Sequence, residues 1–323
     1  MVKTGAPAID CLNAVGCSVT FATDSHPLTA NDLLQRLCHQ DAVIASLESY
    51  SPEVLAAPPA ASLKMISRWG VGFDAVNLPA ATANGILVTN TPGLLDEAVA
   101  DYTLALLLAL ARRIPEGQRA LLANQWSGHW GIDVAGKTLG LVGCGRIALA
   151  VARRAAGFGL RLLASDPTPT AAARALGIRF VALETLLAES DFVSLHAALT
   201  SQTRGLIGET QLRGMKRSAL LINAGRGALL DEAALVRALQ ARWIAGAALD
   251  VFCEEPLSPD HPFRTTPNLL LTPHQASFAF DTGARVSHTA AQAILDAMQG
   301  RRPRFLLNPE VLNSPQCRVT LHD

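Results

Sequence analysis

Short apolar runs alternate with helix-like segments along the chain from residue 136 onward. A strand with both faces buried is apolar throughout, whereas a helix packed on a sheet has apolar residues at every third or fourth position. The alternation therefore predicts a parallel sheet with crossover helices on both faces. The expected strands are TLGLVG, RLLASD, FVSLHA, ALLINA, GAALDVF and NLLLTPH, and the expected crossover helices include RIALAVARRAAGF and DEAALVRALQAR.

A second, weaker set of alternations precedes this region and predicts a smaller α/β lobe. Its expected strands are CSVTFA, DAVIAS, LKMISRWG and GILVTN. We expect one flanking helix over 95–113 and another over 286–300, and the second would return the C-terminal tail to the first lobe. The predicted domains are a discontinuous lobe, residues 1–91 and 279–323, and an inserted lobe, residues 92–278.

The composition favours a folded protein that binds a small molecule. Hydrophobic residues make up 50% of the 323 positions, which is enough apolar material for a large core. Lys and Arg together number 27, as do Asp and Glu, so no net charge attracts nucleic acid or a membrane surface. The strongest apolar run, 104–111, is too short to span a bilayer.

The N-terminus and the cysteines bear on the cellular compartment. MVKTGAPAID lacks the basic segment, apolar stretch and cleavage site of a secretory signal, so we expect a cytoplasmic protein. The 6 cysteines form no CxxC pair and show no Cys/His ligand spacing. This argues against a disulfide framework and a zinc site, and we expect reduced thiols and no metal.

The most specific motif is a glycine-rich turn between an expected strand and an expected helix. Gly143, Gly145 and Ala148 in GCGRIA form the pattern G-x-G-x-x-A. The first glycine permits a tight turn, the second lets a pyrophosphate approach the backbone, and the alanine allows close packing of helix on strand. The phosphates would lie at the helix N-terminus, where backbone N–H groups can bind them.

A carboxylate, Asp166, ends the next expected strand. An acid at this position of a dinucleotide-binding fold accepts hydrogen bonds from the adenosine ribose and repels the extra phosphate of NADP. Together with the glycine motif, it predicts NAD as the cofactor. The alternative is that Asp166 and Pro167 merely begin a turn.

Three later strands of the expected sheet end in polar residues: Arg226, then Asp250 followed by Glu255, then His274. The carboxyl ends of parallel strands meet at one edge, where such folds bind ligands. An imidazole titrates near neutral pH, so His274 is the expected acid/base for hydride transfer at a secondary alcohol. Glu255 would orient its ring, and the planar guanidinium of Arg226 would hold a substrate carboxylate. Asp250 could accept a hydrogen bond from the nicotinamide carboxamide.

Structural interpretations of the same residues stay open. His274 could be an interior histidine, and Glu254 is expected to be solvated rather than catalytic. His196 also follows an expected strand, and we expect it to be structural. Packing explains Arg226 less well, because it lies between two glycines in NAGRG.

These motifs resemble those of the D-isomer-specific 2-hydroxyacid dehydrogenase family over nearly the whole chain. The order RWGVGFDAVNLPAATANGILVTNTPG, AVADYTLALLLALARR, GCGRIA, NAGRG, DVFCEEP and TPH is that of the family, closest to members of the phosphoglycerate dehydrogenase and hydroxypyruvate reductase type. The resemblance implies an NAD-dependent oxidoreductase of a small D-2-hydroxy acid or 2-oxo acid such as phosphoglycerate, hydroxypyruvate or glyoxylate. It also implies a Rossmann NAD-binding domain inserted in a smaller flavodoxin-like substrate domain, lobes that close over both ligands, and a homodimer formed through a helix at 96–113.

The resemblance assigns roles to individual residues, with Arg226, Glu255 and His274 as the catalytic set. The expected cofactor contacts are Val71, Gly143, Gly145, Arg146, Ile147, Asp166, Ala197, Ala224, Gly225, Arg226, Asp250 and His274. The expected substrate contacts are Ser46, Trp69, Gly70, Val71, Gly72, Arg226 and His274.

Several positions depart from the family pattern or leave the substrate open. Ser46 stands where phosphoglycerate dehydrogenases often place a phosphate-binding arginine, which argues against a phosphorylated substrate. Trp69, Trp126 and Trp130 are candidate pocket residues, although Trp69 could equally pack in the interior. MVKTGAPAID begins close to where the family's first strand ends, so the first lobe is expected to lack a central strand unless another segment replaces it.

Two other functions fit parts of the sequence. Corepressors of the same fold keep much of this site, so an interaction protein that senses NAD is the main alternative. Formate dehydrogenases also share the fold, but there the partner of the histidine is typically glutamine, whereas this chain has Glu255. The dehydrogenase of small 2-hydroxy acids is the function that all the motifs favour.

Overall fold

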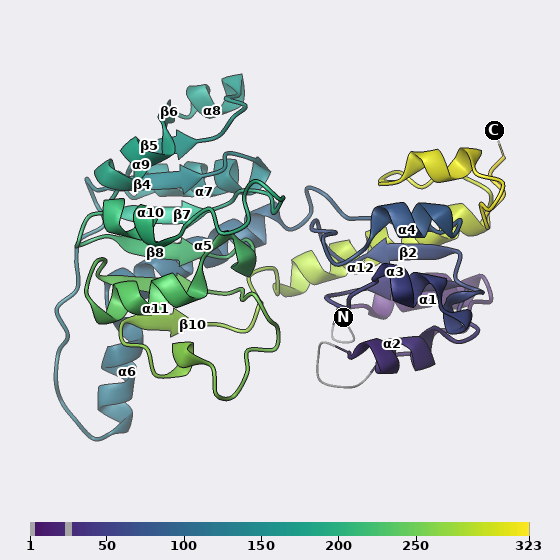
Figure 1. Ribbon diagram of the computed structural model, residues 1–323, viewed down its shortest axis with the longest axis horizontal. Coiled ribbons are helices and arrows are strands. Elements are labelled where there is room, and N and C mark those ends of the chain that lie inside the picture. The colour runs from purple at the N-terminus through teal and green to yellow at the C-terminus, as the bar shows by residue number, and fades with distance from the viewer. Residues whose placement is uncertain (1–3, 23–27, 323) are drawn as a thin grey trace. The chain divides into compact units, whose positions relative to one another are not determined.

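The computed structural model describes residues 4–22 and 28–322. The chain divides into two compact units: Met1–Leu95 with Phe278–Asp323 form unit 1, and Asp96–Ser277 form unit 2 (Figure 1). Unit 2 is therefore a single continuous insertion between the two segments of unit 1. Each unit has its own parallel sheet and its own core.

Unit 2 contains a parallel sheet of 7 strands in the order β10-β9-β8-β7-β4-β5-β6. From β4 the chain adds β5 and β6 on one side and then returns to add β7 through β10 on the other. Such a reversal opens a crevice at the carboxyl ends of the strands, where dinucleotide-binding folds hold their ligand. The strands are β4 Thr138–Val142, β5 Arg161–Ser165, β6 Arg179–Phe180, β7 Phe192–Leu195, β8 Leu220–Asn223, β9 Gly246–Leu249 and β10 Leu269–Leu271.

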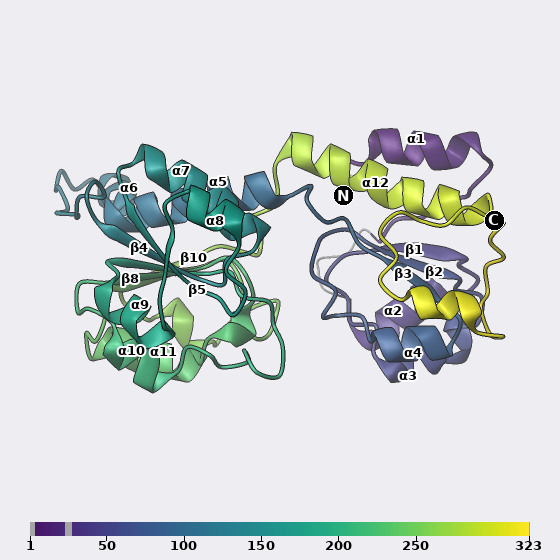
Figure 2. The ribbon, with the colours of Figure 1, turned by 90° about the horizontal axis from the view of Figure 1, so that it is seen from above.

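Helices cover both faces of this sheet: α5, α7 and α8 lie on one face, and α9, α10 and α11 lie on the other (Figure 2). Because both faces are covered, every residue of β4, β7, β8 and β9 is buried. The helices of unit 2 are α5 Asp96–Ala111, α6 Ile114–Leu122, α7 Arg146–Gly157, α8 Ala171–Ala175, α9 Leu183–Glu189, α10 Glu209–Gly214 and α11 Glu232–Gln240.

The apolar run 104–111 lies in α5 and belongs to the core of unit 2. Leu104, Leu106 and Leu107 are buried there against α7 and the sheet. Among the helices that the structure describes, none combines the length and the apolar character that a membrane span requires.

Unit 1 contains a parallel sheet in the order β1-β2-β3, with α1 and α12 on one face and α2, α3 and α4 on the other (Figure 2). Successive residues of a strand point to opposite faces, and here Met65 packs toward α1 and α12 while Ile66 packs toward α2 and α3. The elements are α1 Ala6–Ala14, α2 Ala30–Leu37, β1 Ala42–Ala45, α3 Pro52–Ala56, β2 Met65–Arg68, α4 Leu78–Ala83, β3 Leu87–Thr89 and α12 Phe280–Met298.

Most of the expected elements form, which confirms the α/β fold. The prediction of a strand at CSVTFA is wrong, because residues 17–22 contain none. A strand must pair its N–H and C=O groups with a neighbour, and none of the described strands of unit 1 pairs with residues 17–22. The last long helix begins at Phe280 rather than at 286. The helix continues through Gly283. A Cβ at this position would lie 2.7 Å from the Thr4 hydroxyl, so the glycine permits the close packing of Thr4 on the helix.

The C-terminal segment is fastened to β3 of unit 1. Leu306 forms an antiparallel bridge with Thr89. Asn308 is fully buried, its Oδ1 accepts from the Val88 N–H at 2.9 Å, and its Nδ2 donates to the Ile86 carbonyl at 2.9 Å. The side chain thus satisfies backbone groups at the edge of the sheet that burial would otherwise leave unpaired.

Replacing Asn308 with leucine should destabilise the protein. The substitution leaves the buried Val88 N–H and Ile86 C=O without partners, which should lower the free energy of unfolding by about 2 to 4 kcal/mol. Denaturant unfolding measures the change, with Asn13→Ala on the exposed side of α1 as the control. Equal stability of the two variants would contradict this role of Asn308.

Candidate active site

The unit 2 residues singled out from the sequence lie at one edge of its sheet. All pairs in this sheet are parallel, so the carboxyl ends of its strands share that edge. The residues that directly follow the strands are Gly143 after β4, Asp166 after β5, His196 after β7, Ala224 after β8, Asp250 after β9 and Thr272 after β10.

The glycine-rich turn has the shape that a dinucleotide phosphate requires. Gly143 has a φ of +86°, and a Cβ there would lie 2.5 Å from the Ala197 nitrogen, so only glycine fits against the turn after β7. Gly145 precedes α7, has open space where a side chain would be, and leaves the helix without a side-chain cap. The first N–H groups of α7 are therefore accessible to an anion such as a pyrophosphate. These residues fit NAD.

Asp166 holds the same turn in place. Its Oδ2 accepts from the Cys144 N–H at 2.7 Å, and its Oδ1 accepts from the Thr168 N–H at 2.7 Å. Each carboxylate oxygen has a second lone pair, so the residue can still accept from a ribose hydroxyl. Asp166 thus joins the end of β5 to the turn after β4.

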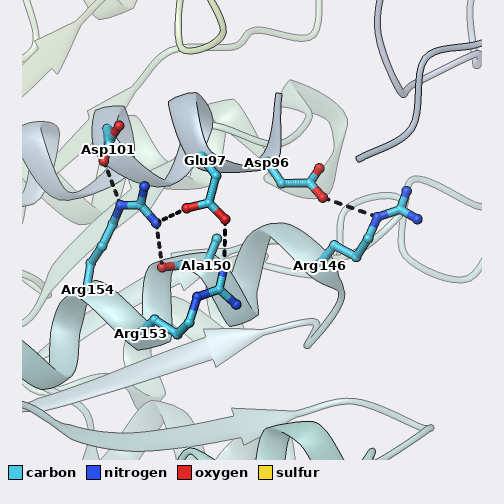
Figure 3. Close-up of polar contacts among 7 residues, drawn as sticks. All are labelled: Asp96, Glu97, Asp101, Arg146, Ala150, Arg153 and Arg154. Carbon is cyan, nitrogen blue, oxygen red and sulfur yellow. Dashed lines mark hydrogen bonds and ion pairs between the residues drawn. The ribbon is translucent and has the colours of Figure 1, made fainter. Parts of the chain in front are cut away.

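Ion pairs join α5 to α7, the helix that follows the glycine-rich turn, from the first residue of α7 to its last turns (Figure 3). Arg146, the first residue of α7, places its Nε 3.2 Å from Asp96 and keeps a side chain that is 60% exposed. Glu97 pairs with both Arg153 and Arg154. Burial raises the pKa of the Asp96 carboxyl, and the Arg146 guanidinium partly opposes this effect. Arg146 is accordingly both held by α5 and accessible to a ligand.

His274 and Glu255 form a direct pair. The Nδ1 atom of His274 lies 2.6 Å from Oε2 of Glu255, and both side chains are partly exposed. The other oxygen of Glu255, Oε1, accepts from the Phe252 N–H at 2.9 Å. The carboxylate therefore fixes the imidazole plane and leaves Nε2 as the ring nitrogen that can reach a ligand.

Asp250 organises the loop that carries His274. Its fully buried carboxylate accepts from the Thr272 hydroxyl at 2.6 Å and from the N–H groups of Gln275 and Ala276 at 3.0 and 2.8 Å. Burial raises the pKa of Asp250, while these hydrogen bonds lower it. His274 has a φ of +48°, a left-handed conformation that the surrounding hydrogen bonds hold. The sequence suggested a cofactor contact for Asp250 and did not show this loop-holding role.

A contact between Tyr102 and Gln275 was missed in the sequence. The Gln275 amide donates to the Tyr102 hydroxyl at 2.6 Å, which joins α5 to the residue after His274. The two positions are far apart in the chain, and neither residue was singled out as a candidate contact from the sequence. Only the packing of α5 on the sheet brings them together.

Arg226 lies on a loop that a buried asparagine shapes. Asn223 accepts from the Gly225 N–H at 3.1 Å and donates to the Arg226 carbonyl at 2.9 Å. The glycine after the arginine does not leave backbone open to a ligand. A Cβ at Gly227 would lie 2.0 Å from the carbonyl carbon of Phe252, so Gly227 permits two loops of the chain to touch.

The predicted substrate loop of unit 1 follows β2 and is held by the end of β3. The Gly70 N–H donates to the Thr91 hydroxyl at 3.0 Å, and the Asn90 amide donates to the Val71 carbonyl at 2.8 Å. Within the described part of the chain, the N–H groups of Val71 and Gly72 donate no hydrogen bond. Two neighbouring amide donors are thus presented on a fixed loop.

Trp69 packs inside unit 1, in agreement with the interior alternative. Its side chain is 9% exposed, and its indole N–H donates to the Ser287 hydroxyl of α12 at 2.9 Å. The ring also meets Phe278 edge to face. Ser46, after β1, donates its N–H to the buried carboxylate of Glu48 at 2.7 Å.

Sequence comparison decides the family. The model of the D-isomer specific 2-hydroxyacid dehydrogenase NAD binding domain matches residues 104–276, which is more than half of the chain. The glyoxylate reductase of Korarchaeum cryptofilum is 43% identical over 297 residues, 90% of this chain and 89% of that protein. The chain belongs to the D-isomer specific 2-hydroxyacid dehydrogenase family. It is accordingly an NAD-dependent oxidoreductase that acts on the CH–OH group of 2-hydroxy acids.

Solved structures of similar enzymes support the same assignment for this 2-hydroxyacid dehydrogenase. D-lactate dehydrogenase from Escherichia coli superposes with a TM-score of 0.83 at 31% identity, over 95% of this chain and 97% of that one. A glyoxylate reductase from Paecilomyes thermophila superposes with a TM-score of 0.82 at 29% identity, over 95% of each chain. The match extends over both units and includes the Rossmann fold of unit 2.

His196 lies beside the expected cofactor contact Ala197. Its Nε2 lies 2.8 Å from the Ser194 hydroxyl. Desolvation by the surrounding protein lowers the pKa of His196 to about 4, so the ring is neutral in the folded dehydrogenase at physiological pH. A neutral ring with a hydroxyl partner supports the expected structural role.

Replacing His196 with glutamine should make the stability of the dehydrogenase less dependent on pH. The unfolded chain protonates a histidine near pH 6.5, whereas the folded state resists protonation until about pH 4. Between these values the unfolded state binds more protons, so stability falls as the pH falls, by roughly 2 to 3 kcal/mol from pH 7 to pH 4. Denaturant unfolding across this range should show a smaller fall for His196→Gln than for the exposed control His129→Gln. Parallel curves would refute the assignment.

Proposed function

We propose that this dehydrogenase reduces small, unphosphorylated 2-oxo acids with NADH, that glyoxylate is the favoured substrate, and that Arg226, Glu255 and His274 carry the reaction. The observation that supports it best is the 2.6 Å contact between Glu255 and His274, on the loops after the adjacent strands β9 and β10. Arg226 follows β8, the next strand of the sheet. The similarity to a curated glyoxylate reductase favours this substrate class.

His274 acts as the acid in reduction and as the base in oxidation. Because Nδ1 faces Glu255, Nε2 would donate the proton to the C2 oxygen of the 2-oxo acid. The carboxylate of Glu255 keeps the ring oriented and stabilises the positive charge of the imidazolium before transfer. The planar fork of donors on Arg226 would bind the substrate carboxylate with two parallel hydrogen bonds.

Unit 2 would hold the cofactor at the carboxyl edge of its sheet. When bound, NADH supplies the hydride that C2 receives. Asp166, already fixed by two backbone N–H groups, would accept from the adenosine ribose and oppose the additional phosphate of NADPH. The cofactor contacts we propose are Val71, Gly143, Gly145, Arg146, Ile147, Asp166, Ala197, Ala224, Gly225, Arg226, Asp250 and His274.

Unit 1 would contribute the amide donors of Val71 and Gly72 to the substrate carboxylate. The loop after β1 disfavours a substrate phosphate. The Ser46 N–H already donates to the buried carboxylate of Glu48, and the negative charges of this carboxylate and a phosphate would repel each other. This favours glyoxylate or hydroxypyruvate over a phosphorylated acid. Trp69, packed on Ser287, would support the loop from within and not touch the substrate.

NADH oxidation with glyoxylate, hydroxypyruvate, pyruvate and 3-phosphohydroxypyruvate tests the proposal. We expect the highest kcat/KM with glyoxylate, the lowest with the phosphorylated acid, and weaker activity when NADPH replaces NADH. His274→Ala removes the acid/base and should lower kcat by about 10²-fold to 10⁴-fold. The control is His288→Ala, on the exposed side of α12, which should keep full activity.

Two results would contradict the catalytic assignment and the substrate class separately. A His274→Ala variant as active as His288→Ala would remove the catalytic assignment. A kcat/KM that is highest for 3-phosphohydroxypyruvate would overturn the substrate class while leaving the chemistry intact.

We further propose that the dehydrogenase is a homodimer whose interface includes the arm at 112–130, which continues from α5. The arm leaves the sheet and helices of unit 2 after Ala111 and returns to them at Ile132, whose N–H donates to the Ala111 carbonyl at 2.9 Å. It extends from the body of unit 2 and contains α6 (Figure 1). Its exposed apolar side chains include Leu122 at 77%, Trp126 at 96% and Trp130 at 97% exposure, which is typical of a surface that a partner covers.

Replacing both Trp126 and Trp130 with serine should weaken the dimer. Truncating a tryptophan at the centre of an interface costs about 2 kcal/mol or more. Light scattering after gel filtration should give twice the chain mass of 34.1 kDa for the unmodified protein and a mass that falls toward 34.1 kDa on dilution of the variant. Phe158→Ser, an exposed aromatic outside the arm, is the control and should leave the mass unchanged. A monomeric unmodified protein would reject the dimer.

A further inference from the structure

The loops that carry Arg226 and Glu255 touch through their backbones. Gly227, directly after Arg226, packs so closely on the Phe252–Cys253 peptide that a Cβ would lie 2.0 Å from the carbonyl carbon of Phe252. The same peptide donates its N–H, from Cys253, to Oε1 of Glu232 at 2.8 Å. One peptide group is therefore held by the Arg226 loop on one side and by Glu232 on the other.

Glu232 is itself well fixed. It is the first residue of α11, next to Asp231, whose side chain caps the helix by accepting from the Ala234 N–H at 2.9 Å. Its side chain is 16% exposed, and its Oε2 lies 3.4 Å from Nε2 of His261. An acid in the first turn of a helix is also stabilised by the helix dipole.

His261 completes the holding of Glu232. Its Nδ1 accepts from the Phe263 N–H at 3.2 Å, so the neutral ring carries its proton on Nε2, toward Glu232. The ring also packs edge to face on Phe263, with centroids 4.6 Å apart, and Phe263 is 1% exposed. Both oxygens of Glu232 thus have defined partners, one in the catalytic loop and one in the segment after it.

We propose that Glu232 is a positioning residue that sets the spacing between Arg226 and the Glu255–His274 pair. It acts through the Cys253 N–H, the neighbouring Phe252 N–H that binds Glu255, and the contact of Glu255 with His274. The inference deepens the proposed function and rests on the roles given there to Arg226 and Glu255. Loss of the tether should impair the chemical step more than cofactor binding, because the glycine-rich turn and Asp166 follow other strands, β4 and β5, and only part of the proposed cofactor contacts lie on the tethered loops.

The reactivity of the Cys253 thiol reports on this contact independently of enzymatic turnover. Desolvation and the nearby carboxylate of Glu232 raise the pKa of the Cys253 thiol to about 11. A thiol reacts with a maleimide through its thiolate, so removal of Glu232 should speed the labelling of Cys253 at a fixed pH near 8. Cys38, which is also exposed and lies in unit 1, provides an internal reference rate.

Three variants test the proposal: Glu232→Ala, Glu232→Gln and Glu209→Ala. Glutamine keeps an oxygen that can accept from Cys253, whereas alanine removes it. Glu209 is the matched control, because it is the first residue of α10 and pairs only with Arg213 and Arg237 among the described residues. Each protein is assayed with the preferred 2-oxo acid, titrated with NADH by fluorescence, labelled with maleimide, and followed by hydrogen exchange over 250–256.

In Glu232→Ala we expect kcat to fall by about tenfold or more, since a small misplacement of a catalytic group has large effects on rate. The dissociation constant of NADH should change much less than kcat, and both Cys253 labelling and hydrogen exchange at 250–256 should become faster. Glu232→Gln should retain most of kcat, and Glu209→Ala should match the unmodified protein throughout.

Unchanged kcat in Glu232→Ala would overturn the positioning role, as would a Glu232→Gln variant impaired to the same extent. Weakened NADH binding with the same loss in both variants would indicate a general structural defect and count against the proposal. If the unmodified protein reduces none of the acids, the proposed function fails. The labelling and exchange rates then still decide whether Glu232 holds the loop.

Discussion

The parallel register of β8, β9 and β10 is the constraint on which the candidate site depends. Asn223 of β8 is the register partner of Leu249 of β9, and Leu249 is the partner of Leu271 of β10. Since the three strands end at the same level, the loops that follow them start side by side. Residues separated by dozens of positions in the chain are thereby brought within reach of one another.

Buried polar side chains then hold these loops in one conformation. Asn223 and Asp250 are fully buried, and each binds the backbone of the loop that carries a proposed catalytic residue. Burying such groups is costly unless their hydrogen bonds are satisfied, and here the loops themselves supply the partners. The loops of the candidate site are therefore preorganised by the same hydrogen bonds that satisfy the buried polar groups.

Much of the architecture follows from local pattern. The strands of unit 2 are continuous apolar runs because helices cover both faces of their sheet. This pattern can be recognised in the amino-acid sequence alone. The strand expected at CSVTFA does not form, because its apolar and β-branched residues indicate propensity while a strand also needs a hydrogen-bonding neighbour. Helix α12 begins at Phe280, before the expected residue 286, and includes Gly283, where the close packing on Thr4 makes glycine the residue that fits.

The sequence by itself determined the α/β fold class, the glycine turn at 143–148, the NAD preference that Asp166 suggests, and the choice of Arg226, Glu255 and His274 as chemical candidates. These depend on residue type and short spacing, which a single chain displays directly. The tertiary structure gave the expected contact of Glu255 with His274 its geometry, and it alone decided that Asp250 holds the loop of His274, that Tyr102 binds Gln275, and that Glu232 binds the peptide next to the Arg226 loop. Such contacts join residues with no fixed separation along the chain, and they exist only after the sheet has aligned its strand ends.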